Sequence, residues 1–164
     1  MYDSDSRAKK LMDNDDAIKQ AIASQISPDA ITSAGQIDRK HLAAVVFADK
    51  EKLQRLNSIV HGAVKRDIAA WRERHPAEPL WVESAIIYES GISEMVDEVW
   101  NVTAPEEIRV DRVVKRNGIS PREVRLRIAA QAVPVASPHE KVFTILNDDV
   151  QPVLPQVLNL LSRG

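Results

Sequence analysis

The segment from Val99 to Arg116 constrains the fold more than any other part of the chain. It opens with a short apolar run, Val99 to Val102, whose β-branched residues are typical of a buried strand. Pro105 then opens a helix with two glutamates in its first turn, where the helix dipole favours acidic side chains. A strand followed directly by a helix is the repeating unit of α/β proteins.

The helix that follows this strand carries three arginines on one face. Arg109, Arg112 and Arg116 stand at i, i+3 and i+7, so their guanidinium groups share a side of the helix, whereas Val110 and Val114 point the other way, toward a core. An arginine face of this kind favours a protein that handles something anionic. A surface helix with solvated charges explains the same spacing, and the pattern alone leaves both interpretations open.

The rest of the chain alternates helices with a few strands, which predicts an α/β fold with a parallel sheet. Helices are expected over residues 6–12, 15–26, 39–48, 50–74, 91–98, 106–116, 120–131 and 150–161, the last one broken near Pro152 and Pro155. Strands are expected over residues 80–88, 99–102 and 142–146, a loop over 135–140, and no strand before Asp3.

The apolar run from Leu80 to Tyr88 reads as a central, parallel-type strand because it is apolar on both faces. Glu89 follows its end. Ligands of open α/β sheets bind at the carboxyl ends of strands, so Glu89 is a candidate site residue. An end residue reaching solvent is the equally open alternative.

Composition excludes several classes of function. The net charge of −2 over 164 residues argues against bulk electrostatic binding to nucleic acid or a membrane. No cysteine is present, and the four histidines are scattered, which disfavours disulfides, a thiolate nucleophile and a histidine metal site. No apolar run reaches membrane-spanning length and the N-terminus lacks an apolar signal core, so we expect a soluble, cytoplasmic protein.

Several segments recur in the order found in one known family. They are YDSDSRAKKLM, IDRKHLAAVVFADKEKLQRLNSIVH, the Glu83–Glu89 stretch, VTAPEEIRVDRVVKRNGISPREVRLRIAAQ, HEK and LNDD. This series resembles dephospho-coenzyme A kinase over nearly the whole chain. The resemblance implies a P-loop kinase fold in a single domain, 1–164, with a helical acceptor-binding region near 15–75 and an arginine-bearing lid near 105–131. It also implies transfer of the γ-phosphoryl of ATP to the ribose 3′-hydroxyl of dephospho-coenzyme A, with Mg²⁺.

The same resemblance implies roles for individual residues. Asp5, the second acid of Asp3-Ser4-Asp5, is similar to the family's base that orients the 3′-hydroxyl. Arg112 and Arg116 match the lid arginines, which stack on adenine and neutralise charge on the transferring phosphoryl. The residues expected to help hold the acceptor are Asp3, Arg39, His61, Glu89 and Lys141. A contact on a helix surface or between helices is an alternative for Arg39, His61 and Arg116.

Two departures from the family pattern bear on activity. The family's first strand and Gly-rich phosphate loop, a βα unit before the Asp-x-Asp, are missing from this sequence, so we expect a truncated chain that binds ATP poorly and is unstable or self-associating. The segment between Lys141 and Asn147 is also shorter than usual, and His61-Gly62 replaces His-Pro. Three hypotheses stay open: a kinase given without its nucleotide loop, a non-catalytic module for coenzyme A-like ligands, and a protein-interaction remnant.

Overall fold

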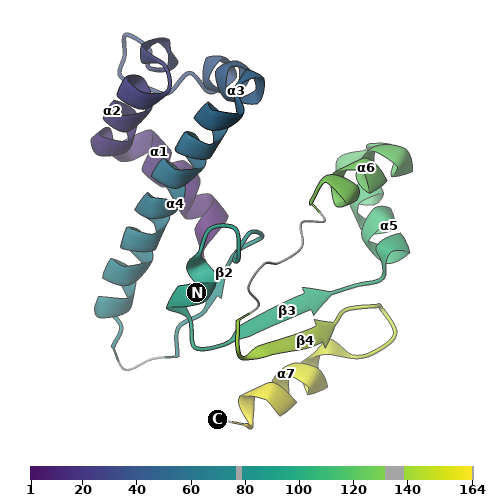
Figure 1. The fold of residues 1–164 in the computed structure, drawn as a ribbon. Helices are drawn as coiled ribbons and strands as arrows, with labels where there is room; N and C mark the ends of the chain where they lie inside the picture. The colour runs from purple at the N-terminus through teal and green to yellow at the C-terminus, as the bar shows by residue number, and fades with distance from the viewer. Residues whose placement is uncertain (77–78, 132–138, 164) are drawn as a thin grey trace. The chain divides into compact units, whose positions relative to one another are not determined.

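The structure is a computed structural model that describes residues 1–76, 79–131 and 139–163. Its backbone forms two compact units, Met1–Ile92 and Ser93–Gly164. Short parallel strands stand among helices in each unit (Figure 1), which confirms the predicted α/β class. No helix within the described ranges is long and apolar enough to cross a membrane.

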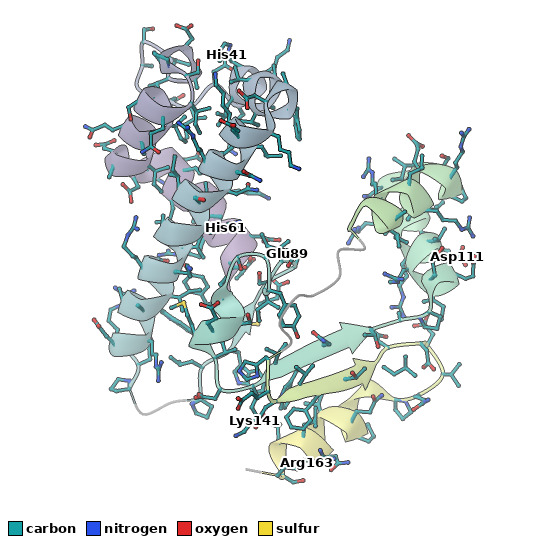
Figure 2. All side chains as sticks on the ribbon, in the orientation of Figure 1. His41, His61, Glu89, Asp111, Lys141 and Arg163 are labelled. Atoms are coloured by element: carbon teal, nitrogen blue, oxygen red, sulfur yellow. The ribbon has the colours of Figure 1, made fainter. Side chains whose placement is uncertain are left out.

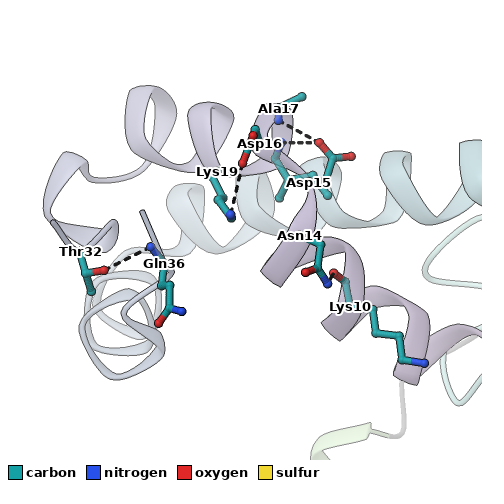
Figure 3. Close-up of polar contacts among 9 residues, drawn as sticks. Lys10, Asn14, Asp15, Asp16, Ala17, Lys19, Thr32 and Gln36 are labelled. Atoms are coloured by element: carbon teal, nitrogen blue, oxygen red, sulfur yellow. Dashed lines mark hydrogen bonds and ion pairs between the residues drawn. The ribbon is translucent and has the colours of Figure 1, made fainter. Parts of the chain in front are cut away.

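The first unit is mainly helical, and each of the four α-helices among its described residues begins after an aspartate. The helices are α1 (Ser4–Asn14), α2 (Asp16–Gln25), α3 (Arg39–Ala48) and α4 (Lys50–Glu73), and the capping residues are Asp3, Asp15, Asp38 and Asp49. Each cap accepts hydrogen bonds from backbone N–H groups that the first helical turn leaves unpaired. Figure 3 shows one of them: Asp15 Oδ1 lies 2.9 Å from the backbone nitrogen of Ala17.

The core of this unit lies where α2, α3 and α4 meet. Ile18, Ile22 and Ile26 recur at four-residue spacing and are all buried, as the sequence pattern predicts. Helix α2 ends before Ser27-Pro28, and the short 3₁₀ helix η1 (Pro28–Ala30) follows. The buried members of the cluster are Ile18, Ile22, Ile26, Ala30, Leu42, Val46 and Ala63.

Two predictions about strands in this unit are wrong. A strand does precede the paired acids, because β1 (Tyr2–Asp3) pairs in parallel with β2 (Val82–Glu83). The expected long strand over 80–88 is reduced to β2, and turns occupy residues 85–90. Strand β2 is short because its partner is short. Strand β1 ends where Asp3 caps α1, so only two residues of β2 can form ladder hydrogen bonds with it. A strand of two residues leaves no period in a sequence.

The sheet of the second unit contains the segment that starts at Val99. Strand β3 (Val99–Thr103) pairs in parallel with β4 (Val142–Leu146) along all five residues, from Val99 opposite Val142 to Thr103 opposite Leu146. Both strands are predicted by the sequence, and β4 has the predicted bounds. Helix α5 (Glu106–Asn117) follows β3 and buries Val110, whereas Val114 is half-buried.

The helices around the second sheet follow the predicted start and stop signals, with two corrections. Gly118 ends α5 with a φ of 66°, and Ser120 and Glu123 form the predicted capping box before α6 (Pro121–Gln131). Helix α7 (Val153–Leu161) is not broken at Pro155, which lies in the first turn where a backbone N–H would be unpaired. The expected helix at 91–98 is the 3₁₀ helix η2 (Ile92–Met95). The predicted loop at 135–140 lies mostly outside the described residues.

Candidate active site

The junction between β1 and α1 places the paired acids. Asp3 ends the strand and caps the helix, accepting hydrogen bonds from Ser6 N at 2.9 Å and Ser6 Oγ at 2.6 Å. The buried Ser4 donates its hydroxyl to the carbonyl of Glu83 on the neighbouring strand, at 2.7 Å. Asp5 therefore stands in the first turn of α1 with its side chain exposed, at the carboxyl end of a parallel strand.

Three carboxylates gather at this end of the two strands. The hydrogen bonds from Ser6 lower the pKa of Asp3. Burial raises the pKa of Glu83, and the negative charges of Asp3 and Asp5 raise it further. The joint negative charge of Asp3, Asp5 and Glu83 favours a ligand with hydroxyl donors at this position.

A polar cluster fixes β1 against α4. Tyr2 Oη donates to Asp67 Oδ2 at 2.6 Å, and Arg7 donates to the same carboxylate through Nε at 2.8 Å and Nη2 at 2.7 Å. Burial raises the pKa of Tyr2 most, and the hydrogen bond to Asp67 and the negative charge of Asp67 raise it further. Burial opposes ionisation of Asp67, but the hydrogen bonds from Tyr2 and Arg7 outweigh it and lower its pKa. Trp71 packs on the Tyr2 ring with centroids 5.4 Å apart.

His61 on α4 faces the turn that follows β2. Figure 2 shows His61 and Glu89 on facing segments of the first unit. Burial lowers the pKa of His61, the charge of Lys65 lowers it further, and the charge of Glu89 opposes both. Lys65 Nζ would lie 3.3 Å from a Cβ built on Gly91, whose φ is 70°. The structure thus brings His61 and Glu89 together, although Glu89 lies in a turn and not at a strand end as predicted.

Arg39 takes part in an interhelical ion pair. Its Nη2 lies 2.7 Å from Asp13 Oδ1, so the first residue of α3 is tied to α1. Both side chains are about half exposed, and exposed pairs of this kind contribute little to stability. This contact is the alternative that the sequence left open for Arg39.

The turn that follows β4 anchors Arg112 of α5. Its Nη2 donates to Asn147 Oδ1 at 3.2 Å and to Asp149 Oδ1 at 2.6 Å, both on the turn after β4. That turn is fixed in its own right, because Asn147 N donates to the carbonyl of Thr103 and Asp148 accepts from two backbone N–H groups. These two bonds lower the pKa of Asp148.

The other predicted residues of this unit are exposed. Arg116 Nε donates to its sequence neighbour Asn117 at 3.0 Å, on the surface at the end of α5. Lys141 is exposed and joins β4 through its backbone, with its carbonyl accepting from Val99 N at 2.9 Å. Within the described ranges, no group of three or more histidine, aspartate or glutamate side chains could hold a metal ion.

The candidate residues are divided between the two units. Asp3, Asp5, Arg39, His61 and Glu89 belong to the first, and Arg112, Arg116 and Lys141 to the second. A search of protein families matches residues 1–150 to the dephospho-CoA kinase model. The chain belongs to the dephospho-CoA kinase family. Its members are kinases of coenzyme A biosynthesis, so the predicted family and its class of transferase are confirmed.

Relatives and solved structures agree with this family. The chain is 34% identical to the dephospho-CoA kinase of Porphyromonas gingivalis over 167 residues, covering 99% of the chain and 80% of the relative. The corresponding Bacteroides fragilis protein is 31% identical, with 99% and 79% covered. A crystal structure of a Thermus thermophilus protein is 28% identical with a TM-score of 0.75, covering 99% of the chain and 82% of the other. The Campylobacter jejuni dephospho-CoA kinase, at 24% identity, a TM-score of 0.66 and coverage of 99% and 85%, shares the fold.

Sequence reasoning missed three residues that the structure places beside the candidates. Asp67 holds Tyr2 and Arg7, Lys65 lies beside His61, and Asp149 holds Arg112. Lys65 follows His61 by four residues on one helix, so spacing alone could have found it. Asp67 and Asp149 meet their partners across 60 and 37 positions of sequence, and no local pattern reports such pairs.

Proposed function

We propose that this chain transfers the γ-phosphoryl group of ATP to the 3′-hydroxyl of dephospho-CoA. The observation that carries the proposal is Asp5, an exposed carboxylate in the first turn after a parallel strand, in a chain of the dephospho-CoA kinase family. A carboxylate there accepts a hydrogen bond from a hydroxyl donor and holds the attacking oxygen in line with the phosphoryl group. Asp3 is fixed as a helix cap, which leaves Asp5 as the base.

The acceptor is assigned to the first unit. His61, with its pKa lowered, is neutral near pH 7 and can donate or accept a hydrogen bond at the turn that carries Glu89. We propose that Asp3, Arg39, His61 and Glu89 hold the acceptor. A role for Lys141 of the second unit in acceptor binding stays a prediction from the family resemblance. We also propose that the helical acceptor-binding region spans about residues 15–75 of a single kinase-like domain, 1–164.

The nucleotide is assigned to the arginines of the lid region near 105–131. A guanidinium group offers five donors in a planar fork, which suits both stacking on adenine and neutralising the oxygens of a transferring phosphoryl. Arg112, half-buried and anchored, is proposed to meet ATP, and Arg116 to neutralise charge beside it. Arg112→Ala is expected to lower the use of ATP by about 10²-fold.

Family membership implies ATP as the phosphoryl donor, and Mg²⁺ is proposed to come with it. The described residues do not fit a dedicated metal centre, since no group of three ligating side chains is present among them. Mg²⁺ in kinases is held mainly by substrate phosphates with one or two carboxylates, which does not require such a centre.

A second candidate is a non-catalytic module that binds coenzyme A-like ligands. The observation that favours it is that no glycine in the 164 residues is followed by lysine, whereas a phosphate-binding P-loop contains a Gly-Lys pair. Such a module would bind dephospho-CoA without consuming ATP. Self-association and the absence of nucleic-acid and membrane partners remain predictions for either candidate.

The deciding experiment is dephospho-CoA-dependent release of ADP from ATP and Mg²⁺, measured on the 164-residue chain. Asp5→Asn is expected to lower kcat by about 10²–10⁴-fold with an unchanged melting temperature. Asp16→Asn is the matched control, because Asp16 is the first-turn acid of α2 as Asp5 is of α1. Dephospho-CoA binding without ADP release would select the binding module, and full turnover by Asp5→Asn would exclude Asp5 as the base.

A further inference from the structure

Asp149 has a backbone conformation that aspartate rarely adopts. Its φ is 63°, in the left-handed region, and it is the one residue other than glycine with a positive φ among those that the structure describes. Side chains with a Cβ disfavour this region, although aspartate and asparagine enter it more readily than most. An uncommon backbone conformation in a turn raises the question of what the side chain contacts.

The contact of Asp149 is Arg112. The Oδ1 atom of Asp149 accepts from Nη2 of Arg112 at 2.6 Å, and Asn147 accepts from the same nitrogen at 3.2 Å. One guanidinium nitrogen is thus held by two residues of a turn that is itself tied to β3 through the Asn147 N–H. A tether of this geometry fixes the plane of the guanidinium group.

The tether leaves most of the guanidinium available to a ligand. Within the described residues no hydrogen bond engages Nε or Nη1 of Arg112, and the side chain is 38% exposed. Asp149 is 70% exposed, so solvent ions screen its charge and weaken its repulsion of a second anion. Arg116 differs, because its hydrogen bond goes to the adjacent residue, Asn117, on the surface.

We propose that Asp149 is a positioning residue that orients Arg112 toward ATP. The inference rests on the proposed function, in which Arg112 meets the nucleotide. Asp149 holds Nη2, and the free edge of the guanidinium, Nε and Nη1, meets the nucleotide. The turn after β4 then acts on the nucleotide through Arg112, without itself touching the reacting atoms.

Two substitutions separate positioning from a merely structural role. Asp149→Gly removes the carboxylate and favours the left-handed backbone, so the turn keeps its shape and the melting temperature is expected to stay equal or rise. Its KM for ATP is expected to rise about tenfold with a much smaller change in kcat, because the arginine is present but less well oriented. Asp149→Asn tolerates the same backbone and keeps an oxygen acceptor without the charge, so its KM is expected to rise less.

The test is a double-mutant cycle on the full chain with Arg112→Ala. If Asp149 acts through Arg112, Asp149→Gly has no further effect on the KM for ATP once Arg112 is alanine. The matched control is Asp111→Asn. Asp111 carries an exposed carboxylate and precedes Arg112 in the sequence (Figure 2), and its substitution is expected to leave the KM for ATP unchanged.

Two results would overturn the inference alone: an unchanged KM in Asp149→Gly while the wild-type chain turns over, or an additive effect in the Arg112→Ala background. A wild-type chain that neither binds ATP nor releases ADP overturns the proposed function, and this inference with it. The cases are told apart because the wild-type assay is read before the variants.

Discussion

The substitution Asp67→Asn tests whether the Tyr2–Arg7–Asp67 cluster holds β1 in place. The carboxylate accepts three hydrogen bonds, from Tyr2 at 2.6 Å and from two nitrogens of Arg7 at 2.7 and 2.8 Å. A hydrogen bond to a charged group contributes about 1.5–3 kcal/mol when buried, and an exposed ion pair about 0–1 kcal/mol. Asp67 is 17% exposed and Arg7 40%, so the cluster lies between these limits. We expect a loss of about 2 kcal/mol in the free energy of unfolding.

The assay is equilibrium unfolding in urea followed by far-ultraviolet circular dichroism. With a urea dependence of about 2 kcal/mol per molar, the loss moves the midpoint down by about 1 M. Tyr2→Phe, which removes only the hydroxyl, should cost about 1 kcal/mol, and Asp16→Asn, on an exposed surface pair, less than about 0.5 kcal/mol. An Asp67→Asn midpoint equal to that of Asp16→Asn would refute the reasoning.

The pKa of Asp67 gives the same prediction a pH dependence. Its pKa is lowered in the folded chain from the ordinary value of 3.8, so the unfolded chain binds the proton more readily. The stabilisation is therefore present above the unfolded pKa and is lost as pH falls through the folded pKa. The difference in stability between wild type and Asp67→Asn should be constant near neutral pH and shrink in the acid range below about pH 4.

Three further predictions concern other parts of the chain. Ile22→Ala, at a fully buried position of the helical core, should lower the free energy of unfolding by about 2–5 kcal/mol, measured by the same urea titration. Ser120→Ala should cost about 1 kcal/mol by removing the capping box with Glu123, and the helix content of α6 read by NMR should fall at its first turn. If the exposed leucines of α7 drive self-association, Leu158→Gln should abolish a concentration-dependent elution volume in gel filtration; a wild-type volume that is independent of concentration would contradict this.

The sequence predicts the elements that are stabilised locally. Helix α3 has the predicted bounds, 39–48, because an aspartate cap and a complete apolar period determine them within the element itself. Strand β4 is also predicted to the residue, since five apolar or β-branched residues stand between polar ones. The capping box before α6 is confirmed for the same reason: Ser120 and Glu123 are three residues apart and satisfy each other.

The strand predictions of the first unit fail because strand length depends on a distant partner. The apolar run at 80–88 is long enough for a central strand, but β1 offers only Tyr2 and Asp3 to pair with. The candidate site likewise has residues that the sequence indicates and residues that only the structure reveals. The resemblance to a family pointed to Asp5 and Arg112. The contacts of Asp67 with Tyr2 and Arg7, and of Asp149 with Arg112, become visible only in three dimensions. The roles of the eight predicted site residues stay predictions.

The pairing of β1 with β2 has a consequence for how the chain forms during synthesis. Ser4 and the residue that accepts its hydroxyl hydrogen bond, Glu83, are 79 residues apart in the chain. At ribosomal rates of about 5–20 residues per second, the first strand waits about 4–16 s before its neighbour is made. The helices between them rely on nearer contacts and can pack in that interval. The arrangement around Asp3 and Asp5 is thus one of the last features of its unit to form on the ribosome, and the nascent Tyr2 stays open to other strands until then.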